Sequence, residues 1–82
     1  MDQAQVFETV VTVLRPYVKN AQALPNVSME TSILKDLEVN SARLVDVILE
    51  LEDRFKIAVS DEDADRVRTV GDAVDIILSL AN

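Results

Sequence analysis

Residues 36–55 read DLEVNSARLVDVILELEDRF, where a loop gives way to a strongly patterned helix at Ser41. Apolar residues recur on one helical face at steps of four, three and four: Leu44, Ile48, Leu51 and Phe55. This spacing predicts a helix over residues 41–56 with one face toward a core. Serine before such a run is most often an N-cap, worth about 1 kcal/mol. Asn40 is an equally good cap, and it would make Ser41 the first helical residue.

Three further helices are predicted around this one. Residues 2–18 carry a wide apolar stripe of helical period despite many β-branched residues, and Pro16 should end or kink that helix near Arg15. Ser60 and Thr69 are expected to cap a short helix over residues 60–67 and a longer one over residues 69–80.

Residues 19–40 predict a long loop with spaced apolar anchors to the core: Leu24, Ile33, Leu34 and Leu37. The sequence therefore predicts an all-α fold, a small four-helix bundle. It has three longer helices, one short third helix and a long loop between helices 1 and 2.

Composition excludes several classes of function. The 82 residues suffice for one small domain, and they include no cysteine and no histidine. The usual neutral-pH base and the commonest metal ligand are therefore absent, so we expect neither an enzyme nor a metal site. The only glycine is Gly71, which rules out a glycine-rich phosphate loop.

The charge balance predicts the kind of partner. Fifteen acidic against eight basic residues give a net charge of −7, which repels nucleic acid and anionic membranes and attracts basic protein surfaces. No apolar run approaches the roughly 20 residues that a bilayer requires. We expect no stable membrane insertion, a monomer, and a location in the cytoplasm.

The motifs, taken in order, resemble the acyl carrier protein family. In that family an Asp-Leu pair precedes a modified serine at the start of an acidic second helix, as Asp36-Leu37 precede Ser41 here. Upstream, TSILKDL (residues 31–37) resembles the family's loop anchor. Downstream, VSDEDADRVRTVGDAVDIIL (residues 59–78) resembles its third and fourth helices without a gap. The resemblance covers about residues 28–80 and implies a single carrier-type domain over residues 1–82.

The resemblance implies a cofactor and its attachment point. A phosphopantetheinyl transferase would attach 4′-phosphopantetheine to Ser41, and the arm's thiol would carry an acyl group as a thioester. The reactive group thus comes from the cofactor, which explains how a chain without cysteine or histidine can take part in thioester chemistry. Acyl-transferring or synthase enzymes of fatty-acid, lipid or polyketide biosynthesis would be the other partners.

Two further sets of residues follow from the resemblance. Basic patches of partners would dock on the second helix, at Asp46, Leu49, Glu52 and Asp53, although a solvated acidic face is the commoner fate of such charge. The acyl chain would enter a space between the helices. Its candidate lining is also compatible with a plain core: Ile48, Leu51, Val59, Ala64, Val67, Ala73 and Val74.

The neighbours of Ser41 depart from the family pattern. Asn40 replaces the usual Asp, Ala42 the usual Leu, Arg43 a commonly acidic residue and Glu38 the usual Gly. Because a transferase grips this region, we expect loading by a tolerant transferase or at a lower rate, and a specialised pathway. The nearest alternative is a peptidyl or aminoacyl carrier, and the next is a cofactor-free acidic helical interaction module.

Overall fold

The computed structural model describes residues 2–81, and within them the fold is all-helical, as predicted. Four α-helices are formed: α1 (Gln3–Leu14), α2 (Ser41–Phe55), α3 (Asp61–Asp65) and α4 (Val70–Ala81). Two 3-10 helices, η1 (Arg15–Tyr17) and η2 (Ala21–Asn26), lie between α1 and α2. None of the helices in this part of the chain is long and apolar enough to cross a membrane.

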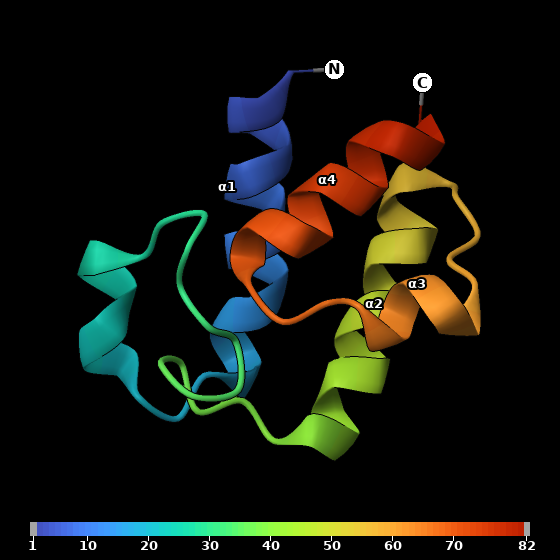
Figure 1. Cartoon of the computed structure of the whole chain (residues 1–82). Helices are drawn as coiled ribbons and strands as arrows, with labels where there is room; N and C mark the ends of the chain where they lie inside the picture. Colours follow the sequence, from blue (N-terminus) through green and yellow to red (C-terminus); the bar gives the residue numbers. More distant parts are fainter. Residues whose placement is uncertain (1, 82) are drawn as a thin grey trace.

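Helix α1 is the central packing partner of the bundle. It lies against α4 and α2, and Figure 1 shows α4 crossing its upper half while α2 runs beside its lower half. The predicted end near Arg15 is confirmed, because α1 stops at Leu14 and the chain tightens into η1 around Pro16. The start of α2 lies at the opposite end of the molecule from the start of α1 and the end of α4 (Figure 1).

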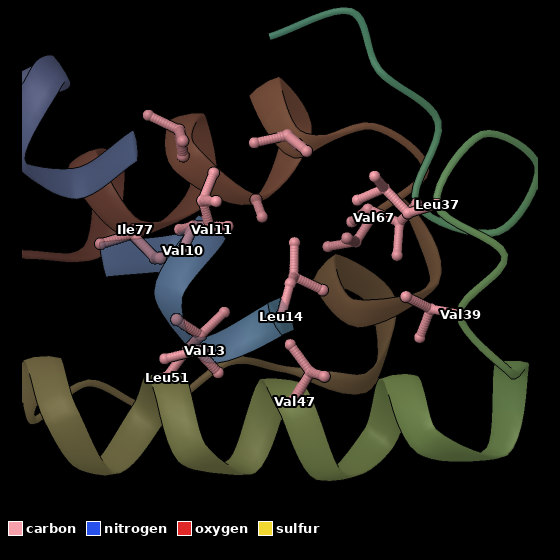
Figure 2. Packing of buried hydrophobic residues seen from close by; sticks show 14 of the residues in the cluster. Val10, Val11, Val13, Leu14, Leu37, Val39, Val47, Leu51, Val67 and Ile77 are labelled. Atoms are coloured by element: carbon pink, nitrogen blue, oxygen red, sulfur yellow. The ribbon is translucent and has the colours of Figure 1, made fainter. Parts of the chain in front are cut away.

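The core combines the three long helices with Ile33, Leu37 and Val39 of the segment before α2 and with Val67 of the segment before α4. Figure 2 shows Val47 and Leu51 pointing from α2 toward α1, where Val13 and Leu14 meet them. The predicted core face of α2 is thus rotated, since Val47 is buried while Leu44 and Phe55 are only partly buried. Spacing alone does not show whether Val47 or Ile48 faces the core, because each lies at a helical spacing from Leu44 and from Leu51.

The segment between α1 and α2 is more ordered than the loop that the sequence predicts. It contains η2, and its two ends are tied together where the N–H groups of Lys19 and Asn20 both donate to the Leu37 carbonyl oxygen at 3.2 Å. The predicted anchors Ile33 and Leu37 are fully buried and Leu24 is partly buried. The prediction for Leu34 is wrong, because that side chain is 41% exposed.

The predicted caps of the last two helices are confirmed. The Ser60 hydroxyl accepts from the Asp63 N–H at 3.1 Å at the start of α3. Thr69 and Asp72 satisfy each other at the start of α4, each side chain accepting from the other's N–H at 3.0 Å. Because the Thr69 N–H donates to it, the Asp72 carboxyl has a pKa below its ordinary value.

Candidate functional site

Ser41 is the first helical residue of α2, and its hydroxyl is not needed to cap the helix. Asn40 is the cap, since its Oδ1 accepts from the Ala42 N–H at 2.8 Å. Asn40, Ser41, Ala42 and Arg43 are all exposed. The helix start therefore presents one primary hydroxyl to solvent, beside backbone N–H groups that carry partial positive charge.

The residues just before Ser41 fix its position. Leu37 and Val39 are buried, and the Val39 N–H donates to the Ile33 carbonyl oxygen at 3.1 Å. Glu38 between them is left-handed, with φ of 55°, in the position where family members usually have glycine. Sequence reasoning missed Val39, because the left-handed turn at Glu38 that points it inward is not visible in the spacing of apolar residues.

Asp36 has a structural task in the same loop. Its Oδ2 accepts from the Ser32 N–H at 2.8 Å, and its own N–H donates to the Ser32 carbonyl oxygen at 3.0 Å. The Asp36-Leu37 pair that suggested the family therefore holds a tight turn against the core. Through that turn it positions the segment that carries Ser41.

The acidic residues of α2 differ in how free they are. Asp46 pairs with Arg43 at 3.2 Å and Glu50 with Arg54 at 3.1 Å, and all four side chains are substantially exposed. Glu52 is engaged inside the protein, because its Oε2 accepts from the Val59 N–H at 2.7 Å in a partly buried bond.

Asp53 makes no ion pair within the described residues and is exposed. Beside these acids Val45 and Leu49 are 58% and 57% exposed. Leu49, which the resemblance implies as a docking residue, is therefore an exposed leucine among acids. Of the docking residues predicted on α2, Leu49 and Asp53 are exposed and Asp46 is half-exposed, whereas Glu52 is turned toward the loop at Val59. Among the three acids, only Asp53 has neither an ion pair nor a side-chain hydrogen bond within residues 2–81.

A pocket of about 230 Å³ separates α2 from α3. Three of the predicted cavity residues line it, namely Ile48, Val59 and Ala64. The other four are buried in the core cluster: Leu51, Val67, Ala73 and Val74. The sequence did not predict the other lining residues as part of a cavity; they are Val45, Leu49, Glu52, Asp61 and Asp65.

A metal centre is not part of this arrangement. Residues 2–81 contain no group of three or more potential ligands placed to hold a metal ion.

The family model described as "Phosphopantetheine attachment site" matches residues 17–77, a span that includes α2, α3 and most of α4. The chain belongs to the phosphopantetheine-attachment family of carrier proteins. The prosthetic group of this family is 4′-phosphopantetheine, and its members are carriers rather than enzymes.

Two relatives connect this carrier to acyl carrier proteins. It is 33% identical over 81 residues to the mitochondrial acyl carrier protein of Saccharomyces cerevisiae, a match that covers 96% of this chain and 65% of the yeast protein. The carrier thus spans less than two thirds of that relative. Among solved structures it is similar to the acyl carrier protein from Enterococcus faecalis, with a TM-score of 0.79, 34% identity, and coverage of 98% of this chain and 99% of that one.

Proposed function

We propose that this protein is an acyl carrier that holds its cargo as a thioester on a 4′-phosphopantetheine arm attached to Ser41. The observation that supports the proposal is that capping and attachment fall to two different residues at the start of α2. Asn40 caps the helix, so the exposed Ser41 hydroxyl is free for modification. The buried Leu37 and Val39 hold the segment before it in place.

The residues around Ser41 fit the negative charge of a phosphodiester. The first N–H groups of α2 point toward the serine end of the helix, and a helix of this length favours an anion there. Arg43 adds a positive charge in the first turn. When bound, the arm supplies the thiol on which an acyl group is carried, which the chain's own residues cannot supply.

Loading requires Ser41 to act as a nucleophile. Its Oγ attacks the phosphorus of coenzyme A that bears the pantetheine, forming the new P–O bond. The pyrophosphate P–O bond breaks and the nucleotide phosphate leaves. The hydroxyl proton passes to a base of the transferase, because this chain has no histidine or cysteine to take it.

The exposed side of α2 is proposed as the docking surface for the transferase and for synthase or acyl-transferring enzymes with basic patches. Val45 and Leu49 offer apolar contact, and Asp53 and the paired Asp46 offer negative charge. Such charge should affect association rates and salt dependence more than affinity. The residues nearest Ser41 (Asn40, Ala42, Arg43) would decide which transferase and which pathway the carrier serves.

The pocket between α2 and α3 is proposed as the entry for the acyl chain. Ile48, Val59 and Ala64 give it an apolar wall. Leu51, Val67, Ala73 and Val74 would line its deeper part only if α3 and its flanking loops move outward, because those four side chains now fill the core. Helix α3 is the element best placed for such movement, with five residues and none buried.

The deciding experiment is mass measurement after loading. The apo protein is incubated with coenzyme A and a broad-specificity phosphopantetheinyl transferase, and its intact mass is compared with that of Ser41→Ala. We expect a gain of one arm in the unmodified sequence, no gain in Ser41→Ala, and a normal gain in Ser79→Ala, which removes an exposed serine on α4. A gain that persists in Ser41→Ala would refute the attachment site. No gain in any variant would favour a cofactor-free interaction module.

Further predictions concern the pathway and the state of the protein. Slow elongation by housekeeping synthase enzymes is expected of a specialised carrier. Mass spectrometry of protein from its own host reports the cargo and separates an acyl from an aminoacyl carrier. A single carrier domain over residues 1–82, a monomer and a cytoplasmic location remain our predictions. Cell fractionation tests the last against an organelle, which the name of the yeast relative makes the alternative.

A further inference from the structure

A second pocket lies on the loop side of Ser41 and has the opposite charge to the rest of the protein. It measures about 420 Å³ and lies between the turn at residues 32–35 and the segment that links α3 to α4. Its lining combines one exposed leucine, one hydroxyl and two cations: Leu34, Ser32, Lys35 and Arg68. We call it the Lys35–Arg68 pocket.

Backbone hydrogen bonds tie this pocket to the segment that carries Ser41. The Ile33 N–H donates to the Arg68 carbonyl oxygen at 3.0 Å, which joins the two walls. The Ile33 carbonyl oxygen in turn accepts from the Val39 N–H at 3.1 Å, two residues before Ser41. Figure 1 shows the turn and the start of α2 at the same end of the molecule. A flexible arm on Ser41 therefore begins close to the pocket.

The two cations are available to a ligand. Neither Lys35 nor Arg68 forms an ion pair within residues 2–81. The nearby carboxylates accept from backbone groups, since Asp36 accepts from the Ser32 N–H and Asp72 accepts from the N–H groups of Arg68 and Thr69. The Arg68 charge also acts on Asp72, but without a direct ion pair. Both Lys35 and Arg68 are exposed, so they are free to turn toward an incoming anion.

The neutral lining completes a site for a chain with an anionic end. The Ser32 hydroxyl accepts from the Lys35 N–H at 3.1 Å, which leaves its own hydrogen to donate. The Leu34 side chain, 41% exposed, offers apolar contact beside the charges. Methylene groups would pack on Leu34 while a carboxylate pairs with the cations.

We propose that the Lys35–Arg68 pocket binds the free carboxylate of an acyl group carried on the arm, so that the cargo class is a carboxyl-terminated acyl chain. This inference rests on the proposed attachment of the arm at Ser41. The phosphodiester of the arm has the same anionic chemistry but is bonded directly to Ser41 at the helix start. The leucine and the cations together match a carboxylate at the end of a carbon chain better.

The test compares two cargoes of equal length that differ only at the far end. The apo protein is loaded from glutaryl-coenzyme A or pentanoyl-coenzyme A by a broad-specificity transferase, and loading is checked by intact mass. Amide chemical shifts of apo, holo, pentanoyl and glutaryl forms are then compared by NMR. We expect the glutaryl form alone to shift the amides of Ser32, Lys35 and Arg68, with the shifts reduced in high salt.

Variants establish which side chains cause the shift. Contacts between exposed charges of this kind should raise the ratio of docked to undocked glutaryl cargo about fivefold over that of pentanoyl cargo. Lys35→Gln or Arg68→Gln should each lower that ratio about twofold, and the double variant should remove the difference between the two cargoes. Arg66→Gln is the matched control, because Arg66 is exposed on the same segment but does not line the pocket.

The NMR and mass results distinguish the carboxylate proposal from its alternatives. Equal shifts in the holo, pentanoyl and glutaryl forms would assign the anion to the phosphodiester and overturn the carboxylate proposal. No shift in a fully loaded glutaryl form would also overturn it and leave the cations to an acidic partner side chain. Absence of any loading at Ser41 in the mass spectrum would instead overturn the proposed function, and this inference with it.

Discussion

Gly71→Ala should destabilise the protein, although alanine is the better helix former. Gly71 lies in the first turn of α4, and its N–H donates to the Met29 carbonyl oxygen at 2.8 Å. A Cβ atom at this position would lie 2.6 Å from the same oxygen and 3.2 Å from the Met29 Cβ. Real Cβ atoms essentially never lie as close as 2.6 Å to a backbone oxygen, so either the loop at Met29 or α4 must move.

Two opposing terms set the magnitude. Alanine in a helix gains about 1 kcal/mol over glycine. Overpacking against backbone costs about 1–3 kcal/mol, and a lengthened hydrogen bond costs about 1 kcal/mol more. The net loss is about 1–3 kcal/mol. For a domain of this size that corresponds to a drop in Tm of roughly 5–15 °C.

Thermal unfolding followed by far-UV circular dichroism measures this loss. Ser79→Ala on the exposed side of α4 is the matched control, because it adds helix propensity without a clash and should leave Tm unchanged or slightly higher. A Tm for Gly71→Ala equal to or above that of the unmodified sequence would refute the steric argument. It would show that the segment at Met29 yields without cost.

Two further predictions concern backbone conformation and pH. Glu38 and Lys56 are left-handed, with φ of 55° and 54°, so Glu38→Gly and Lys56→Gly should each raise the free energy of unfolding by about 1 kcal/mol in urea titrations; a loss would contradict the strain argument. The Asp72 carboxyl has its pKa lowered from 3.8 chiefly by the Thr69 N–H, so its stabilisation is present above that value and disappears as the pH falls through the folded-state pKa. Asp72→Ala should therefore lose about 1 kcal/mol near pH 7 and little at the lowest pH, and a pH-independent loss would contradict this.

The sequence predicted best where a single residue type has one local use. Pro16 ended α1, and Ser60 and Thr69 capped their helices. Each of these depends on neighbours within about four residues. The same local reasoning left Ser41 open between cap and attachment point, and in the structure the cap is Asn40 through a bond to the Ala42 N–H.

Prediction was weaker in the segment before α2, where the spacing of apolar residues does not show which side chains face the core. Residues 31–39 contain four apolar side chains, of which Ile33, Leu37 and Val39 are buried while Leu34 is exposed. The turn at Ser32–Asp36 rotates Leu34 outward, and its hydrogen bonds join backbone groups that a pattern of side chains does not describe. The lining of an acyl cavity stays a prediction, and its seven residues divide between the pocket beside α3 and the core, because apolar residues at both places share helical spacing.

The net charge of −7 overstates the negative charge that α2 presents to a partner, because some of its acids are paired. On α2 the acids Asp46 and Glu50 are offset by Arg43 and Arg54, and Glu52 holds the loop at Val59. The negative charge that a basic partner meets there thus depends most on Asp53 and on Asp61 and Asp65 of α3, which border the pocket between α2 and α3. Nearer Ser41, Lys35 and Arg68, which form no ion pair within residues 2–81, have the opposite sign. A partner selected only for a basic patch would be repelled by that end, so discrimination among partners should be greatest where the arm is attached.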